Sequence, residues 1–232
     1  MNPDPLLFAE AVGVNISNKD LLIQAFTHRS YLNEHRSWKQ DHNERLEFLG
    51  DAVLELVVTN FLYQSFPTKP EGELTAYRAA LVNTTTLSDA AKNLNINEYL
   101  LLSKGEAKDT GRARQYILAN TFEAVVGAIY LDQGYDVAAK FITDNLLYLM
   151  KEIIAKNLWQ DAKSFFQEKA QEVEGVTPSY EVLKEVGPDH DKRFTVGVYL
   201  KDDLVAEGEG HSKQEAEQEA ARIALTIKGW GI

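Results

Sequence analysis

Three acidic residues recur at three- and four-residue steps in the stretch from Asn43 to Leu54. Glu47 follows Glu44 by three residues, and Asp51 follows Glu47 by four. On a helix these spacings bring side chains to one face, where like charges repel by about 0.2–0.5 kcal/mol. A hard, oxygen-seeking cation would turn that repulsion into attraction. The spacing therefore indicates either a cation site or an acidic, solvated helix face.

These carboxylates belong to a helical pattern that continues to about Tyr63. Its apolar side chains recur every three or four residues and are expected to pack inward: Leu46, Leu49, Val53, Leu56 and Val57. Gly50 lies inside this helix, where glycine costs roughly 1 kcal/mol relative to alanine. We therefore expect something to approach the backbone closely at Gly50.

A second long helix, expected over residues 112–133, carries another polar pair. Asn120 and Glu123 are three residues apart, so they share a face. Small side chains around them would let another helix come close, namely Ala119, Ala124, Gly127 and Ala128. Both helices therefore combine oxygen-bearing side chains with positions suited to close packing.

The chain up to residue 156 predicts an all-α domain. Further helices are expected over 4–12, 19–27, 73–82, 84–94 and 135–156, with Asn18 and Asn83 as N-caps. The segment Thr27–Tyr31 follows without a predicted helix, and a polar loop then extends to Asp41. We interpret His28 as a structural histidine, not a base. No partner for base catalysis is visible at a suitable spacing.

The pattern changes near Trp159. A helix over 161–174 is followed by strands at 180–186, 193–200 and 204–208 and by a closing helix at 210–224. Helix, three strands and helix make an α+β module. We place the two domains at residues 1–157 and 158–232.

Composition gives weaker constraints. The chain has 232 residues, 44% apolar content and no cysteine, and its N-terminus does not read as a secretory signal. Its longest apolar run, 124–131, is too short to span a bilayer. We expect a soluble, cytoplasmic protein without a membrane partner. The net charge of −11 argues against nucleic acid when taken alone, although local patches matter more than the sum.

Two strings of the first domain resemble the signature motifs of the ribonuclease III family. They are Asn43–Leu54 and the run from Gly105–Arg112 through Ile117–Ala124. The resemblance implies an all-α ribonuclease III nuclease domain that cuts both strands of double-stranded RNA, as in rRNA and mRNA processing, leaving 5′-phosphate and 3′-hydroxyl ends. It also implies Mg²⁺, for which Mn²⁺ can substitute, as the cofactor.

The resemblance assigns residues as well. It implies a metal site of Glu47, Asp51, Asn120 and Glu123, with Asp51 and Glu123 as the least replaceable catalytic residues. Three further acidic residues match the family pattern and are candidates for positions just outside the metal site or for RNA contacts, or else are solvated surface: Glu44, Glu71 and Glu106.

A homodimer is implied too, through antiparallel packing of two signature helices. Phe48 is the candidate interface residue, and a buried role within one chain is the alternative.

Position 120 departs from the family pattern, which usually has Asp there. An amide oxygen can ligate Mg²⁺ but brings no charge, so metal affinity should fall. Either Asn120 is a working variant, or it disables the site and leaves a catalytically impaired double-stranded-RNA-binding protein. We favour the working variant, because the other acidic positions of the pattern are intact.

The second domain resembles a double-stranded-RNA-binding domain, which reads the shape of A-form RNA. The residues expected to contact RNA are Gln167, Glu168, His190, Ser212 and Lys213. Gln214 and Glu217 occupy positions where the family often has basic residues, and residues 160–232 carry nine basic and fifteen acidic side chains. For the function of the whole chain, one further alternative is an acidic helical scaffold that does not bind RNA.

Overall fold

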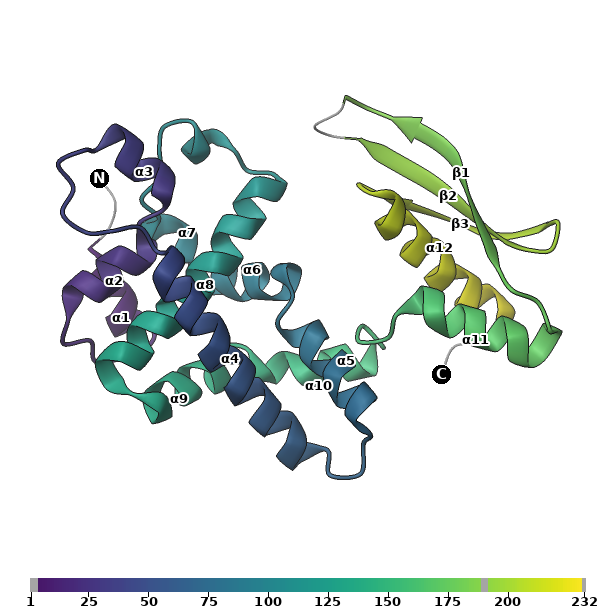
Figure 1. Cartoon of the computed structure of the whole chain (residues 1–232), viewed down its shortest axis with the longest axis horizontal. Coiled ribbons are helices and arrows are strands. Elements are labelled where there is room, and N and C mark those ends of the chain that lie inside the picture. The colour runs from purple at the N-terminus through teal and green to yellow at the C-terminus, as the bar shows by residue number, and fades with distance from the viewer. Residues whose placement is uncertain (1–3, 189–191, 231–232) are drawn as a thin grey trace. The chain divides into compact units, whose positions relative to one another are not determined.

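The computed structural model describes residues 4–188 and 192–230. The chain forms two compact units, residues 1–159 and 160–232 (Figure 1). The first unit includes Trp159, because its ring packs edge-on against Tyr77 with centroids 4.9 Å apart. In the described part of the chain, no helix has the length and apolarity needed to cross a membrane.

The first unit is all α, as the sequence predicts. Its helices are α1 (Pro5–Ala11), α2 (Lys19–Phe26), α3 (Arg29–Glu34), α4 (Glu44–Ser65), α5 (Glu71–Leu81), α6 (Thr84–Asn93), α7 (Ile96–Tyr99), α8 (Arg112–Gln133), α9 (Tyr135–Asn145) and α10 (Met150–Ala155), with 3₁₀ turns η1 (Glu106–Lys108) and η2 (Leu147–Leu149). The predicted N-caps are confirmed. The Asn18 side chain accepts from the amide of Asp20, and the Asn83 side chain accepts from Thr86.

The core of this unit is built around the two long helices, α4 and α8, which cross one another (Figure 1). Leu54 of α4 and Phe122 of α8 are fully buried, and the middle of α8 is buried on nearly every face. A central helix of this kind needs apolar residues on most faces, which explains the long apolar run near residues 124–131.

The backbones of α4 and α8 touch where they cross. A Cβ built on Gly50 would lie 1.8 Å from the carbonyl oxygen of Glu123, and one built on Gly127 would lie 2.3 Å from the carbonyl oxygen of Leu46. No side chain fits in either gap. The close approach predicted at Gly50 is confirmed, and the approaching group is the backbone of α8.

Three local predictions were wrong. Residues 29–34 form a short helix instead of a loop, capped by the His28 side chain, which accepts from the amide of Ser30. The single helix expected over 135–156 is broken at Leu146 (φ −133°), and this break buries both Leu146 and Leu147. Leu56, expected to face the core, is 57% exposed.

The α2–α3 connection is tied to the segment that precedes η1. The amide of His28 donates to the Leu101 carbonyl oxygen, and that of Leu101 donates to Phe26. Further along, the Ser103 amide donates to Ser30 Oγ at 3.1 Å. These bonds fix the start of the connection that carries Glu106.

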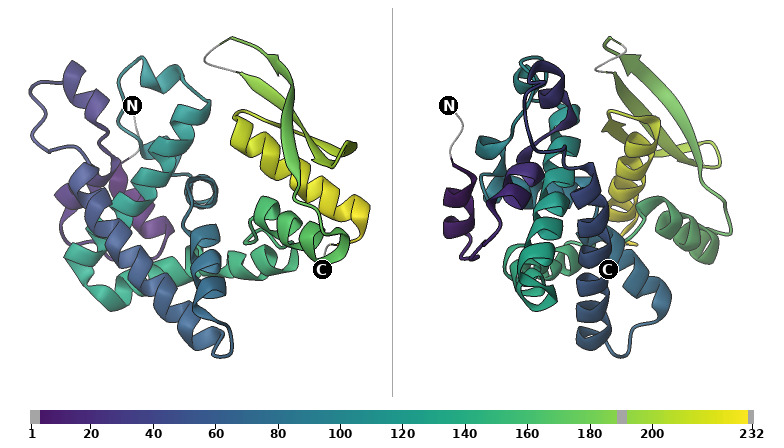
Figure 2. Two further views of the ribbon diagram at one scale, coloured as in Figure 1. Left: turned by 45° about the vertical axis from the view of Figure 1, so that its right-hand side comes forward. Right: turned by 60° about the vertical axis from the view of Figure 1, so that its left-hand side comes forward.

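The second unit has the predicted order of elements: α11 (Ala162–Glu174), β1 (Ser179–Val186), β2 (Arg193–Leu200), β3 (Asp203–Gly210) and α12 (Lys213–Lys228). The strands form one antiparallel sheet in the order β1-β2-β3. Helix α12 packs on one face of this sheet, with α11 beside it (Figures 1 and 2).

Close packing of α12 on the sheet depends on glycine in β3. A Cβ at Gly208 would lie 2.1 Å from the amide nitrogen of Ala220, and one at Gly210 would lie 2.6 Å from that of Ala216. The hydrophobic core of the second unit contains Phe166, Val198 and Leu200.

We predict that Gly50→Ala destabilises the protein, although alanine normally stabilises a helix. The added methyl group would meet the backbone of α8, which cannot rotate away, so the loss should be about 3 kcal/mol, at the upper end for overpacking. Gly72→Ala is the matched control, because Gly72 lies in α5, where an added Cβ would have no other atom within 4 Å. Thermal unfolding measures both. Equal stability of the two variants would contradict the backbone contact.

Candidate active site

The two polar pairs predicted from the sequence meet where α4 crosses α8. Glu47 and Asp51 come from α4, and Asn120 and Glu123 come from α8. The Asn120 amide donates a hydrogen bond to the Glu47 carboxylate. Glu123 is close enough to both Asp51 and Glu47 to be repelled by their charges. The crossing thus brings three carboxylates and one amide together.

Burial and mutual repulsion disfavour the ionised forms of the carboxyl groups in this cluster. Burial raises the pKa of Glu123 to about 8, and the charges of Asp51 and Glu47 act in the same direction. The pKa of Glu47 is raised by burial and by the neighbouring Glu44 and Asp51 carboxylates, against the hydrogen bond from Asn120. A cation bound among these oxygen atoms would offset both effects.

The chemistry of the side chains suits a hard divalent cation. Carboxylate and amide oxygens are ligands that Mg²⁺ prefers, and Mg²⁺ usually keeps several waters instead of taking a complete protein cage. Among residues 4–188 and 192–230, no group of three or more Asp, Glu or His side chains forms a ready-made metal site. A cation would therefore have to draw the repelling carboxylates closer.

Glu44 lies beside this cluster, and Glu106 lies near His28. The charge of Glu44 repels that of Glu47. Glu44 also forms an ion pair with Arg29, whose Nη1 lies 3.3 Å from Glu44 Oε1. Burial lowers the pKa of His28, although the charges of Glu106 and Glu44 act to raise it. Both glutamates are therefore near His28, one at the start of α4 and one in η1.

Arg114 holds the segment that carries Glu106, a role that the sequence analysis missed. Its guanidinium donates to the carbonyl oxygens of Glu106 at 2.6 Å and Asp109 at 3.2 Å, and to Asn97 Oδ1 at 3.0 Å. The sequence offered no signal for this role, because the partners are mostly backbone atoms in an irregular connection.

Glu71 occupies a different place. It begins α5, and its carboxylate accepts from Thr75 Oγ1 at 3.0 Å. It also lines a pocket of about 420 Å³ together with Leu62, Tyr63 and Leu74. None of the four residues at the helix crossing lines this pocket.

Phe48 is on the surface. Its side chain is 80% exposed, which excludes the buried role within one chain. Two more exposed apolar side chains follow on α4, Leu56 at 57% and Tyr63 at 73%. Their spacing of eight and seven residues places all three along one stripe of the helix.

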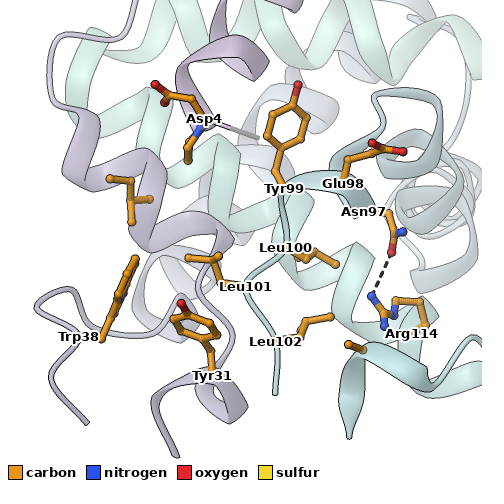
Figure 3. A pocket seen from close by; sticks show the side chains of 13 residues that line it. Asp4, Tyr31, Trp38, Asn97, Glu98, Tyr99, Leu100, Leu101, Leu102 and Arg114 are labelled. Atoms are coloured by element: carbon orange, nitrogen blue, oxygen red, sulfur yellow. Dashed lines mark hydrogen bonds between the residues drawn. The ribbon is translucent and has the colours of Figure 1, made fainter. Parts of the chain in front are cut away.

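A pocket of about 700 Å³ elsewhere in the first unit is not the acidic site. It is lined by Tyr31, Trp38, Tyr99 and neighbouring apolar residues, and the Arg114–Asn97 hydrogen bond lies at its edge (Figure 3). It contains none of the four side chains at the α4–α8 crossing.

The second unit presents most of its predicted contacts on two helices. Gln167 and Glu168 are exposed on α11. Ser212 is the N-cap of α12, where its side chain accepts from the amide of Glu215, and Lys213 is the first residue of that helix. His190 lies outside the described residues.

Glu217 neutralises a lysine of the same unit. Lys163 Nζ lies 2.6 Å from Glu217 Oε2 and 4.8 Å from the centre of the Tyr180 ring. Glu217 therefore removes a positive charge near α12 in addition to contributing its own negative charge.

These features define a class of protein: an all-α unit with a carboxylate site suited to a divalent cation, followed by an α-β-β-β-α module. Residues 18–150 match the family model described as Ribonuclease-III-like, and residues 162–227 match the double-stranded RNA binding motif. The chain belongs to the ribonuclease III family. It is an endoribonuclease, a hydrolase that acts on double-stranded RNA.

Relatives named Ribonuclease 3 resemble the chain over nearly its whole length. That of Borreliella burgdorferi is 43% identical, with 94% of this chain and 89% of the relative covered. That of Carboxydothermus hydrogenoformans is 44% identical, covering 98% and 97%. A solved nuclease domain of ribonuclease III from Campylobacter jejuni is 38% identical, with a TM-score of 0.53 over 60% of this chain and 95% of that domain.

We predict that Glu123→Gln stabilises the metal-free protein at alkaline pH. The folded-state pKa of about 8 lies above the ordinary 4.5, so the stabilising contribution of Glu123 is complete below 4.5 and is lost as the pH rises through 8. Glutamine does not ionise. The gain in free energy of unfolding should therefore grow over this range and exceed about 1.4 kcal/mol, the equivalent of one pKa unit.

Thermal unfolding in a chelator, between about pH 5 and pH 9, measures this gain. Glu10→Gln is the control, because the Glu10 side chain on α1 is exposed to solvent. A difference between wild type and Glu123→Gln that does not change with pH would contradict the electrostatic account.

Proposed function

We propose that the chain cleaves both strands of an RNA duplex with Mg²⁺ held at Glu47, Asp51, Asn120 and Glu123. Mn²⁺ would substitute, and the products would carry 5′-phosphate and 3′-hydroxyl ends. The proposed setting is maturation of rRNA and mRNA in the cytoplasm. The observation that carries this proposal is the convergence of the four side chains where α4 crosses α8.

When bound, the cation supplies a nucleophilic water and stabilises the charge that develops on the phosphate. The residues of the chain would bind this cation and orient it. Glu47, Asp51 and Glu123 would provide the negative charge that holds the cation, and a bound cation would favour the ionised form of Glu123, whose pKa burial and the acidic neighbours raise to about 8. Asp51 and Glu123 are the proposed catalytic residues.

Asn120 has a defined task in this arrangement. Its side chain acts on Glu47, and its amide oxygen is a neutral ligand that Mg²⁺ accepts. The three carboxylates that remain beside it support the working variant over a disabled site. Glu44, beside the cluster, and Glu106, which lies near His28, are proposed to act on the metal's waters or on the RNA backbone.

The second unit is proposed to hold the duplex. Gln167 and Glu168 can hydrogen-bond in a minor groove of A-form RNA, where 2′-hydroxyls are accessible. Lys213 adds its charge to the positive end of α12, which suits a phosphate. Ser212 and His190 complete the proposed contacts.

We also propose a homodimer through α4. If two copies of α4 pack antiparallel about Leu56, Phe48 of one copy lies opposite Tyr63 of the other. Tyr63 borders the pocket of about 420 Å³ that also contains Leu62, which offers an apolar place for the Phe48 ring. Glu71 lines the same pocket, so it would approach the partner's acidic site. Each copy would then cut one strand.

Cleavage of a labelled long duplex in Mg²⁺ and in Mn²⁺ tests the active site. Glu123→Gln should lower the rate by at least about 100-fold, as expected for loss of electrostatic stabilisation in the reaction. Its duplex binding should persist. Wild-type binding without cleavage in either metal would instead support the impaired RNA-binding protein.

Asn120→Asp tests the departure from the family pattern. The added charge should lower the Mg²⁺ concentration for half-maximal cleavage by about tenfold, or ~1.4 kcal/mol, with little change in rate at saturating Mg²⁺. A rate that rises by orders of magnitude at saturating Mg²⁺ would show that Asn120 disables the site.

Phe48→Ala tests the dimer. Loss of an aromatic side chain that fills a pocket of the partner should weaken self-association by about 2 kcal/mol or more, measured by sedimentation velocity over a range of concentrations. Leu7→Ala, an equally simple truncation of an exposed residue on α1, should leave association unchanged. A wild-type chain that sediments as a monomer while it cleaves RNA would overturn the dimer.

A further inference from the structure

The segment that carries Glu106 has little apolar packing of its own. None of the three described residues of η1 is buried. Ala107, in the middle of η1, borders both the pocket of about 700 Å³ and a second pocket of about 390 Å³. A segment with few buried apolar contacts opens locally at a low cost in free energy. The position of η1 therefore depends mainly on hydrogen bonds to other elements.

Two elements supply these hydrogen bonds. On the α3 side, the amide of Lys104 donates to both carboxylate oxygens of Glu34, at 3.2 Å each. From α8, the Arg114 guanidinium donates to the carbonyl oxygen of Glu106 at 2.6 Å and to that of Asp109 at 3.2 Å. Arg114 thus joins one backbone position within η1 to another just after it, where the chain leads into α8.

The arrangement of these bonds suits a guanidinium group. Arg114 uses Nη2 for Glu106, Nε for Asp109 and Nη1 for Asn97 Oδ1, the last at 3.0 Å (Figure 3). The guanidinium holds its donors in a rigid, planar fork, whereas the lysine ammonium is a single point charge on a flexible stem. Because the bond to Glu106 is made to the backbone of that residue, it restrains the position from which the Glu106 side chain extends.

Glu106 is connected to the proposed active site through its neighbours. Burial lowers the pKa of His28, whereas the charges of Glu106 and Glu44 both act to raise it, so both carboxylates lie near this ring. Glu44 in turn repels Glu47, one of the four residues at the helix crossing. A displacement of η1 would therefore change the distance between the Glu106 carboxylate and the start of α4.

We propose that Arg114 is a positioning residue for cleavage and that it acts through Glu106. The inference rests on the proposed function, in which Glu106 acts on the metal's waters or on the RNA backbone. Arg114 holds η1 so that the Glu106 carboxylate stays at the distance that this role requires. It does so through its two backbone hydrogen bonds, without a contact of its own to the cation or to the RNA.

Cleavage kinetics of Arg114→Gln, Glu106→Gln and the double variant test this proposal. Arg114→Gln should lower kcat/KM by about 10–100-fold, as is usual when the support of a functional side chain is lost. The double variant should be no worse than Glu106→Gln, because Arg114 would then have no functional carboxylate to position. The two single variants should also change the same parameter: kcat, KM or the Mg²⁺ concentration for half-maximal cleavage. Arg114→Lys should restore little, since it lacks the planar fork.

Hydrogen–deuterium exchange of the full chain without metal or RNA gives a second measurement. Arg114→Gln should speed exchange of the backbone amides of residues 104–111 by about tenfold or more, because hydrogen bonds to a charged group are lost. Ile129→Val is the control for general destabilisation. Ile129 is buried near the other end of α8, so its truncation should leave both this local exchange and cleavage nearly unchanged.

Losses that multiply in the double variant would overturn the proposal, because Arg114 would then act independently of Glu106. Unchanged exchange of residues 104–111 in Arg114→Gln would overturn it as well. If Glu106→Gln cleaves normally while Glu123→Gln does not, the proposed active site stands and the positioning role fails. A wild type that does not cleave is instead a failure of the proposed function, and the exchange measurement, which needs no activity, then decides the Arg114 contact by itself.

Discussion

The contact between the backbones of α4 and α8 is the constraint on which the nuclease unit depends. Gly50 and Gly127 let the helices approach until carbonyl oxygens occupy the space that a Cβ would need. Glu47 and Asp51 flank Gly50, and Glu123 lies one turn before Gly127. Any side chain that separated the helices would also separate the carboxylates, so the packing of the core and the geometry of the site are one property.

This arrangement opposes charge repulsion with apolar burial. The cluster holds three carboxylates in a partly buried place, and the pKa of Glu123 rises to about 8 as a result. Fully buried side chains such as Leu54 and Phe122 contribute about 1.5–3 kcal/mol each. A few of them offset the unfavourable burial of one carboxyl group. The fold can therefore hold these carboxyl groups near one another despite their repulsion.

Much of this could be predicted from the sequence, because it depends on local signals. Helix caps at Asn18 and Asn83, the α-β-β-β-α order and the shared face of Glu47 and Asp51 follow from spacing alone. Leu56 shows the limit: periodicity identifies an apolar stripe but does not tell a core face from an exposed one. The break at Leu146 and the hydrogen bond from Asn120 to Glu47 depend on tertiary contacts, which no local pattern contains.

An acidic site that acts on RNA faces a second repulsion, from the phosphates of its substrate. Neither unit removes it by bulk charge, since the chain carries −11 overall and Lys163 is already paired with Glu217. In the proposed function, attraction would come from a few positive points at helix ends, such as Lys213 on α12. At the proposed cleavage site, a bound cation would offset the charges of both the carboxylates and the phosphate. Cation binding and substrate binding would then be coupled, because each would reduce the repulsion that opposes the other.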